Sequence, residues 1–255
     1  MPEIAKPTVV GAAPQGATDK ASAARAVREM FTSIAPRYDL LNHVLSLNVD
    51  RMWWRRTARR FRHILTRSDA RALDLCCGTG DMTFALRRAG KSAPQIFGAD
   101  FSHAMLQRAS AKSASLNPTQ RIPAWIESDA LNLPFPDGHF DLVTSAFGFR
   151  NLADYDGGLG EILRVLKPGG ECGILDFGEP NGALGEIYRI YFKHILPRLG
   201  SVLSGVKGPY AYLPASVERF PEPAEMCARM KTCGFSKASW TPYTFAIAGL
   251  YRGKA

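Results

Sequence analysis

Cysteine and long apolar runs are both scarce in this sequence of 255 residues. Its five cysteines are too few and too scattered for a disulfide scaffold, and their odd number fits a reducing compartment. No apolar run approaches the ~18 residues that span a bilayer, and the N-terminus lacks the apolar core of a secretory signal. These absences exclude membrane-spanning and secreted classes. They predict a cytoplasmic protein, free or peripheral on the inner face of the membrane.

The composition is otherwise that of a soluble globular protein, with 46% apolar and 22% charged residues. A chain of this length forms one large domain, or one domain with an accessory part. Acidic residues are outnumbered, and the net charge is +9. Most of the excess lies in residues 1–71, where thirteen Lys/Arg face six Asp/Glu. This asymmetry predicts an anionic surface partner there, either nucleic acid or anionic lipid, or simply a solvated basic face.

A basic amphipathic helix, capped by Asp50, is expected from residue 51 to about 66. Seven arginines and no acidic residue lie between Arg51 and Arg67. A cationic helix with one apolar face attracts anionic lipid by about 1 kcal/mol for each cation near the surface. The apolar face is formed by residues at helical spacing, namely Trp54, Ala58, Phe61 and Leu65.

Four regions follow one another along the chain. Residues 1–24 are expected to be a disordered tail, and residues 25–69 an N-terminal helical cap. From 70 to 178, strands and helices alternate, which predicts a parallel sheet with right-handed crossovers and helices on both faces. Residues 179–255 belong to the same domain. They begin with an aromatic, loop-rich stretch at 183–213, expected to be either a helical insertion packed on the core or a lid over an apolar substrate.

The boundaries expected within these regions are given by number. Strands are expected at 70–76, 95–100, 124–127, 141–146 and 171–177, and helices at 81–89, 102–115 and 156–166. A last helix at 223–233 and a closing pair of strands at 240–242 and 245–251 complete the chain.

The turn after the first strand contains Gly78 and Gly80. Glycine allows the backbone of such a turn to approach a ligand. Asp100 closes the next strand, twenty residues after Gly80, which is the spacing at which a carboxylate accepts hydrogen bonds from ribose hydroxyls. The pattern predicts a nucleoside site at the carboxyl edge of the sheet.

The charges around this turn select the nucleoside. Asp74 and Asp81 flank the glycines and would repel a pyrophosphate, which a helix N-terminus otherwise attracts. Thr83 stands where a dinucleotide fingerprint has its third glycine, and no P-loop lysine follows. Two carboxylates suit a cationic ligand such as a sulfonium. S-adenosylmethionine fits best, and a tight turn without any ligand is the alternative.

Two further strand ends add to this site. Asp129 and Ala130 follow the third strand, where a polar and then a small residue suit the adenine ring. The fourth strand is followed by Phe-Gly-Phe-Arg-Asn at 147–151, whereas methylases of amines usually carry Asn/Asp-Pro-Pro-Tyr/Phe there. This difference counts against nitrogen as the methyl acceptor. The histidines and the pair Cys76-Cys77 lack metal-ligand spacing, so no metal is expected.

Four segments resemble those of a known family, the demethylmenaquinone and demethoxybenzoquinol C-methyltransferases of menaquinone and ubiquinone biosynthesis. They are 38–42 (Tyr-Asp-Leu-Leu-Asn), 73–81, 133–137 and 147–151. The resemblance extends from about Phe31 to the C-terminus. It implies a class I S-adenosylmethionine-dependent methyltransferase: a Rossmann-like α/β fold, mostly parallel, with an antiparallel C-terminal strand, an N-terminal helical cap and an aromatic lid.

The resemblance implies methylation of a ring carbon in a prenylated quinol. The expected reaction is demethylmenaquinol to menaquinol, with the ubiquinone-pathway benzoquinol as a further or alternative acceptor. The cofactor contacts it implies are Thr79, Asp100, Asp129 and Ala130. With Asp74, Gly78 and Gly80 from the turn, these are the expected cofactor-binding residues.

The acceptor requires other groups, because its hydroxyl has a phenol-like pKa near ~10 and must lose or share a proton. Arg150 is expected to stabilise the phenolate charge, and Asn151 and Tyr38 to orient the acceptor. No general base is assigned. Ala146 stands where many members have Ser, and Ala211 where some relatives carry Arg, so the roles of those side chains do not carry over.

Two other functions compete with this one. An RNA methyltransferase would explain the basic helix but neither the aromatic stretch nor the 147–151 segment. A noncatalytic cofactor-binding scaffold would transfer no methyl group. The expected partners are a prenylated quinol and, in preference to nucleic acid, an anionic membrane surface, and the oligomeric state, a homodimer included, stays open.

Overall fold

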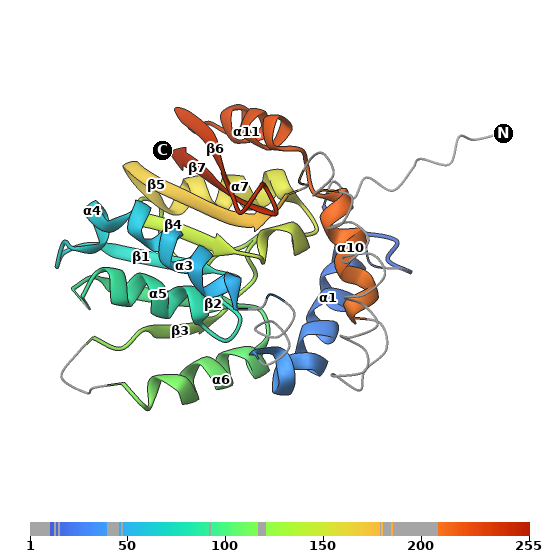
Figure 1. The fold of residues 1–255 in the computed structure, drawn as a ribbon, viewed down its shortest axis with the longest axis horizontal. Coiled ribbons are helices and arrows are strands. Elements are labelled where there is room, and N and C mark those ends of the chain that lie inside the picture. The colour runs from blue at the N-terminus through green and yellow to red at the C-terminus, as the bar shows by residue number, and fades with distance from the viewer. Residues whose placement is uncertain are drawn as a thin grey trace.

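The computed structural model describes residues 11–12, 14, 16–39, 46, 48–91, 93–116, 121–178, 180, 185 and 209–255. Its centre is a seven-stranded sheet with the order β3-β2-β1-β4-β5-β7-β6 (Figure 1). Strand β7 runs antiparallel to β5 and β6, and the pairs from β3 to β5 are parallel. The predicted fold class, mostly parallel with an antiparallel C-terminal strand, is confirmed.

The strands of the sheet are β1 (Arg71–Leu75), β2 (Gln95–Asp100), β3 (Ala124–Glu127), β4 (Phe140–Ala146), β5 (Leu166–Phe177), β6 (Lys237–Tyr243) and β7 (Ala248–Lys254). The crossover helices are α5 (Asp81–Ala89), α6 (His103–Ser113) and α7 (Tyr155–Val165), and α11 (Pro223–Thr232) precedes β6. Strand β5 begins earlier than the expected residue 171, because Leu166 already pairs with Phe140. The pairing resumes at Leu142 and Glu171, so residues 167–170 form the irregularity between the two pairs.

Alternate residues of the central strands enter two separate cores. Leu73 and Val143 belong to the core under α7 and α11, whereas their neighbours Ala72 and Leu142 belong to the core on the opposite face. The two-residue period of a strand produces this division, and it explains why the central strands are apolar throughout. Helices therefore cover both faces of the sheet, as predicted.

Helices α3 (Val49–Arg60) and α4 (Arg62–Leu65) pack on one face of the sheet. Their buried residues include the predicted apolar face, with Phe61 and Leu65 0% exposed. The expected single helix is broken at Phe61, and Asp50 is not its N-cap. Asn48 holds that position, while Asp50 lies in the first turn, where its Oδ1 accepts a hydrogen bond from the Arg51 amide.

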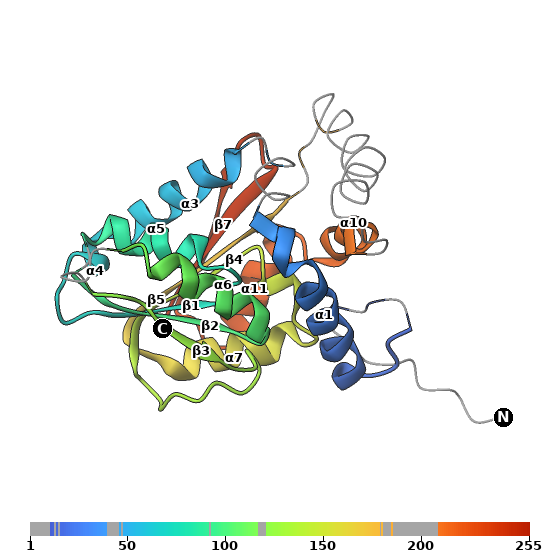
Figure 2. The same ribbon diagram turned by 90° about the horizontal axis from the view of Figure 1, so that it is seen from below.

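Helix α1 (Lys20–Ile34) and the short helix η1 (Ala35–Arg37) lie across the carboxyl edge of the sheet, beside α10 (Pro209–Arg219) (Figure 2). The Asp19 side chain caps α1 by accepting from the Ser22 amide at 2.7 Å. The helix therefore starts inside the stretch expected to be a disordered tail. Farther upstream, the Ala12 amide donates to the Leu152 carbonyl.

Helix α10 contacts α1 and the short helix η2 (Phe149–Asn151). Most of the expected aromatic lid at 183–213 lies outside the described residues. None of the helices in the described part of the chain has the length and apolar character needed to cross a bilayer.

Candidate functional site

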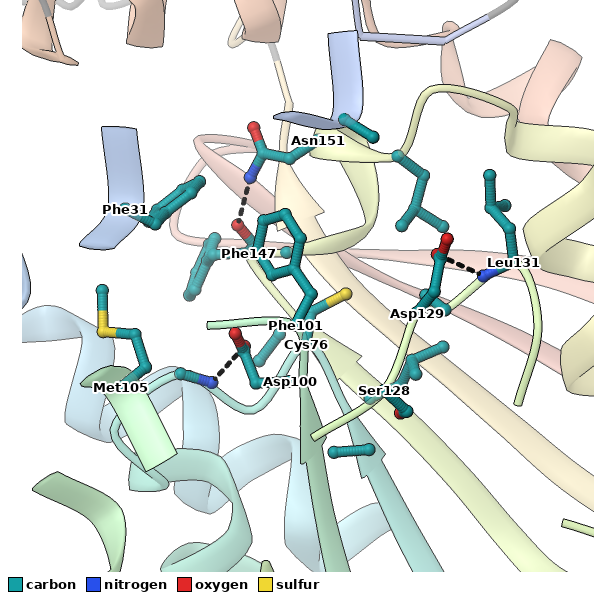
Figure 3. A pocket seen from close by; sticks show the side chains of 18 of the residues that line it. Phe31, Cys76, Asp100, Phe101, Met105, Ser128, Asp129, Leu131, Phe147 and Asn151 are labelled. Atoms are coloured by element: carbon teal, nitrogen blue, oxygen red, sulfur yellow. Dashed lines mark hydrogen bonds between the residues drawn. The ribbon is translucent and has the colours of Figure 1, made fainter. Parts of the chain in front are cut away.

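A pocket opens at the carboxyl edge of the sheet, below α1 (Figure 3). The space at this edge, open solvent included, is about 740 Å³. One side, which we call the sheet side, comprises residues at the ends of β1 to β4, within 75–78, 99–105, 128–131 and 146–153. The other, which we call the cap side, comprises Ala24, Phe31 and Tyr38.

Asp100 lies at the end of β2, where parallel-sheet ligand sites are expected. Its Oδ2 accepts from the Gly78 amide at 2.8 Å, and its Oδ1 accepts from the Ser102 amide at 2.9 Å. Burial raises the pKa of this carboxyl to about 6, although the amide hydrogen bonds oppose the rise. The two amides fix the carboxylate orientation, and each oxygen keeps a lone pair for a ligand hydroxyl.

Gly78 and Gly80 form the turn between β1 and α5, as predicted. Both have positive φ angles, and Gly78 lines the pocket. A Cβ atom at Gly80 would lie 2.6 Å from the Trp125 ring, so this position requires glycine for space as well as conformation. Gly80 itself does not line the pocket, and it acts by allowing the turn to close.

Thr79, between these glycines, is 1% exposed and lies outside the pocket lining. Its Oγ1 donates to Asp39 Oδ1 at 2.5 Å and accepts from Lys112 Nζ at 3.0 Å. The side chain that was expected to contact the cofactor is thus directed toward the cap and α6.

Asp74 does not line the pocket either, which differs from its expected role as a cofactor contact. It is fully buried and accepts hydrogen bonds from Thr83 Oγ1 at 2.6 Å and Thr144 Oγ1 at 3.0 Å. Burial raises its pKa to about 7. Asp74 fastens β1 to α5 and β4, and Thr83 replaces the glycine of a dinucleotide fingerprint because it supplies one of these donors.

The end of β3 contributes Ser128, Asp129 and Ala130 to the pocket, as predicted for the last two. Asp129 Oδ1 accepts from the Leu131 amide at 2.9 Å, which orients the carboxylate. Ala130 is 6% exposed and presents only a methyl group to the pocket. A polar group beside a small one suits a heteroaromatic ring with an amino group.

The segment that follows β4 turns sharply beside the pocket. Phe147 has a φ angle of 58°, a left-handed conformation that costs a residue other than glycine about 1–2 kcal/mol. The turn also passes very close to the end of β1, since a Cβ atom at Gly148 would lie 2.3 Å from the Cys76 Cβ. The surrounding contacts must hold this strained turn in place.

Arg150 supplies those contacts. Its Nη1 donates to Asp176 Oδ1 at 2.7 Å and to the Phe147 carbonyl at 2.5 Å, and its backbone amide donates to Asp176 Oδ2. Both side chains are buried, at 6% and 0% exposed, and Arg150 is absent from the pocket lining. The guanidinium is paired with a buried carboxylate, and this differs from the expectation that it faces a phenolate.

Asn151 and Tyr38, the two expected orienting residues, both line the pocket. The Asn151 Nδ2 donates to the Phe147 carbonyl at 3.5 Å, while its buried Oδ1 has no hydrogen-bond partner among the residues that the structure describes. A buried acceptor without a donor costs about 1–3 kcal/mol, so a hydrogen bond to this oxygen would be favourable once the amide turns toward the pocket. The Tyr38 ring packs edge-on against Phe31 with centroids 6.1 Å apart.

Several pocket residues were not identified from the sequence. They are mostly apolar: Phe31, Cys76, Phe101, Met105, Leu131 and Leu152. The available signal was position alone, because most of them follow a strand or lie on α1 or α6, and apolar pocket walls have the same composition as the core. Asp176, which holds Arg150, ends a strand as Asp100 does, and this pattern could have drawn attention to it.

The chain is similar to proteins of known class over most of its length. The model of the ubiE/COQ5 methyltransferase family matches residues 18–255. A demethylmenaquinone methyltransferase of Deinococcus radiodurans is 48% identical, with 92% of this chain and 95% of the relative covered. One from Thermus thermophilus is 47% identical (88% and 99%). The ubiquinone/menaquinone biosynthesis C-methyltransferase UbiE of Geobacter sulfurreducens is 42% identical (89% and 88%).

Solved structures with little sequence identity share the fold. A putative S-adenosylmethionine-dependent methyltransferase from Methanococcus maripaludis has a TM-score of 0.58 at 19% identity, with 86% of this chain and 90% of that chain covered. An S-adenosylmethionine-dependent methyltransferase from Thermotoga maritima, described as a possible histamine N-methyltransferase, has a TM-score of 0.57 at 15% identity (89% and 98%). At these identities the likeness shows the architecture alone.

Proposed function

The chain belongs to the ubiE/COQ5 methyltransferase family, and on that premise we propose which acceptor it methylates and how. It is an S-adenosylmethionine-dependent C-methyltransferase of quinone biosynthesis. The acceptor we propose is demethylmenaquinol, which becomes menaquinol, with the ubiquinone-pathway benzoquinol as a second candidate. Two of its most similar relatives carry the name demethylmenaquinone methyltransferase. An RNA methyltransferase and a noncatalytic scaffold are not favoured by these relatives.

The sheet side of the pocket fits S-adenosylmethionine. Asp100 presents an oriented carboxylate suited to ribose hydroxyls, and Asp129 with Ala130 forms a ledge suited to adenine. The described lining residues include no lysine or arginine, so the pocket offers no cation that would repel a sulfonium. When bound, S-adenosylmethionine supplies an electrophilic methyl group.

The acceptor half of the reaction depends on residues 147–151 and on Tyr38. We propose that Asn151, which lines the pocket and whose buried Oδ1 has no partner among the described residues, turns this oxygen toward the quinol hydroxyl and accepts its hydrogen bond. A hydroxyl that donates this hydrogen bond has a more polarised O–H bond. Its oxygen therefore donates more electron density to the ring, and the density rises at the neighbouring ring carbon. The Tyr38 side chain orients the ring from the cap side. Phe31, Met105 and Leu152 line the pocket and exclude water around the reacting carbon.

We assign Arg150 a positioning role in this reaction. Its guanidinium holds the Phe147 carbonyl and Asp176, and the same carbonyl accepts from Asn151. Arg150 thereby fixes the strained turn that carries Asn151 into the pocket. The observation that carries the proposed function is this geometry: one pocket joins an oriented carboxylate for the cofactor with an unpartnered acceptor on the family's 147–151 segment.

A methyl-transfer assay tests the proposal. Purified protein is supplied with labelled S-adenosylmethionine and with short-tailed demethylnaphthoquinol or demethoxybenzoquinol under reducing conditions. We expect transfer to the naphthoquinol at the higher kcat/KM. Transfer to the benzoquinol alone would reassign the acceptor, and transfer to neither quinol would contradict the proposed function.

We further propose that the arginine face of α3 contacts an anionic membrane surface, where a prenylated quinol resides. The side chains of Arg51, Arg55 and Arg59 are exposed and form no ion pair with any described residue. Burial and then repulsion from Arg55 lower the pKa of Arg88 on α5, so cations of the two helices converge. Such a face gains about 1 kcal/mol for each cation near anionic lipid.

The tip of the β6–β7 hairpin supports the same contact. Phe245 is 76% exposed at this tip, and Met52 on α3 is 50% exposed. The Trp53 indole joins the two elements by donating to Thr244 Oγ1 at 2.8 Å. Co-sedimentation with vesicles of neutral or mixed anionic lipid tests the proposal. We expect binding to the anionic vesicles that weakens in high salt and in an Arg51→Glu/Arg55→Glu variant; binding that ignores lipid charge would refute it.

A further inference from the structure

Lys112, in the last turn of α6, reaches three acceptors on other elements. Its Nζ lies 2.8 Å from Asp39 Oδ2, 3.1 Å from Asp81 Oδ1 and 3.0 Å from Thr79 Oγ1. Thr79 Oγ1 donates in turn to Asp39 Oδ1 at 2.5 Å. The four side chains form one closed cluster of two carboxylates, one ammonium and one hydroxyl.

This cluster joins elements that come together only in the folded chain. Asp39 directly follows Tyr38 on the cap side, Thr79 lies between the two glycines of the β1–α5 turn, and Asp81 opens α5. The Tyr38 ring carbon Cε1 lies 3.8 Å from the position that a Cβ atom would take at Gly78. The contacts of Lys112 therefore hold the tyrosine against the glycine turn.

The charges show why a cation is required at this point. Asp39 and Asp81 both approach within 3.1 Å of the same amino group and would repel each other without it. A lysine in the last turn of a helix is stabilised slightly by the helix dipole. The dipole does not explain why this lysine contacts the carboxylates of both Asp39 and Asp81. The side chains of Lys112, Asp39 and Asp81 are 31%, 21% and 22% exposed, so water reaches the cluster and permits it to open.

We propose that Lys112 is a positioning residue for the methyl transfer, a role that rests on the proposed function. It fixes the distance between the cap side, with Tyr38, and the cofactor turn at residues 78–80. Loss of its charge releases the Tyr38-Asp39 segment, so that the acceptor is no longer aligned with the methyl donor. Cofactor affinity changes less than turnover, because Asp129 lies outside the cluster and the Asp100 carboxylate is held by the Ser102 amide as well as by the turn.

The test compares Lys112→Met, which keeps the length of the side chain without its charge, with Lys112→Arg. Lys231→Met is the matched control, since Lys231 is exposed on α11 and lies outside the pocket lining. We expect Lys112→Met to lower kcat/KM for the quinol about tenfold and to weaken S-adenosylhomocysteine binding by threefold or less. Lys112→Arg should recover to within about threefold of the unsubstituted protein, and Lys231→Met should not differ from it.

A double-mutant cycle separates positioning from general loss of structure. If Lys112 acts through Asp39, Lys112→Met/Asp39→Asn should be no worse than Lys112→Met alone. Multiplying defects, or a Lys112→Met enzyme within twofold of the unsubstituted protein in kcat/KM, would overturn the proposal. If Lys112→Met does not fold, the comparison is made between Asp39→Asn and the double variant Asp39→Asn/Lys112→Arg. The double variant should then be no worse than Asp39→Asn alone, and multiplying defects would overturn the proposal.

Failure of the proposed function would be visible separately. If the unsubstituted protein methylates no quinol, the acceptor assignment fails. The role of the cluster is then tested without a turnover measurement. The probe is hydrogen–deuterium exchange of residues 35–39 in the presence of S-adenosylhomocysteine. Faster exchange in Lys112→Met than in Lys231→Met supports the positioning role of Lys112, and equal exchange refutes it.

Discussion

The two sides of the pocket are held by different kinds of interaction. The sheet side is fixed by buried groups: Asp100 between two amides, and Arg150 with Asp176 behind the 147–151 turn. The cap side is attached by ion pairs at least partly open to water, such as Arg28–Glu127, with side chains 51% and 40% exposed. Buried charge pairs are costly to break, whereas exposed pairs contribute about 0–1 kcal/mol. Under the proposed function, the sheet side is thus preorganised for the cofactor, while the cap side can open for a large prenylated acceptor.

The largest effect is expected from the buried pair on the sheet side. Asp176→Asn leaves the Arg150 guanidinium buried without its counter-charge. We expect the free energy of unfolding to fall by about 3–5 kcal/mol, and turnover to be lost in the protein that remains folded. Urea denaturation measures the first effect.

The matched control is Asp156→Asn, which breaks the exposed pair with Arg229 and should cost about 1 kcal/mol or less. Equal losses in the two variants would show that the sheet side is not held by buried charge as we describe.

The carboxylate that we propose for cofactor binding comes next. Asp100→Asn should weaken S-adenosylhomocysteine binding tenfold or more, since charge-assisted hydrogen bonds contribute about 1.5–3 kcal/mol. Because the pKa of Asp100 is raised to about 6, binding by the unsubstituted protein should also weaken as the pH falls below about 6. Calorimetric titration between pH 5 and 8 measures both. Unchanged affinity in the variant would remove Asp100 from the site.

Asp74 provides a pH test of the buried framework. Its pKa is about 7 in the folded protein and near ~3.9 when unfolded, so the folded state keeps a proton that the unfolded state releases. The contribution of Asp74 to stability therefore falls as the pH rises from about 4 to 7. We expect Asp74→Asn to gain about 2–3 kcal/mol relative to the unsubstituted protein between pH 5 and 8.

Urea denaturation at several pH values gives this difference directly. Glu29→Gln, at an exposed position of α1, is the control and should give a curve parallel to that of the unsubstituted protein. A parallel curve for Asp74→Asn as well would contradict the burial of a titrating carboxyl.

The smallest effect is expected on the cap side. Glu127→Gln removes the exposed ion pair between Glu127 and Arg28. This change should alter the free energy of unfolding by less than about 1 kcal/mol. The change should disappear in high salt, because salt screens exposed charges. A loss as large as that of Asp176→Asn would abolish the contrast between the two sides.

The sheet was predictable because local signals and packing agree. Helix α5 and strands β2 and β3 have the expected bounds, since alternating apolar residues and the glycine turn indicate the same elements that the core requires. The break in the arginine helix was not predictable. Phe61 packs into the core on one face of the sheet. Its ring lies 2.6 Å from the position that a Cβ atom would take at Gly173, which is 112 residues away in the chain.

The site was predictable where a residue ends a strand, as Asp100, Asp129 and Ala130 do. It was not predictable where a distant partner decides which way a side chain points. Asp74 points to Thr144 and Arg150 points to Asp176, and neither partner is adjacent in sequence. The charge of each side chain suggested that it binds a ligand. In the structure, however, Asp74 accepts hydrogen bonds from protein hydroxyls and Arg150 pairs with a protein carboxylate.

The most direct test of a carbon-methylating enzyme with one shared pocket is the fate of a labelled methyl group. The protein is incubated with S-adenosylmethionine labelled with ¹³C at the methyl group and with short-tailed demethylmenaquinol under reducing conditions, and the product is examined by NMR. We predict that the label appears on a ring carbon, and that Asn151→Ala lowers the rate at least tenfold. Label on a quinol oxygen, or full activity in the Asn151 variant, would contradict the geometry we describe.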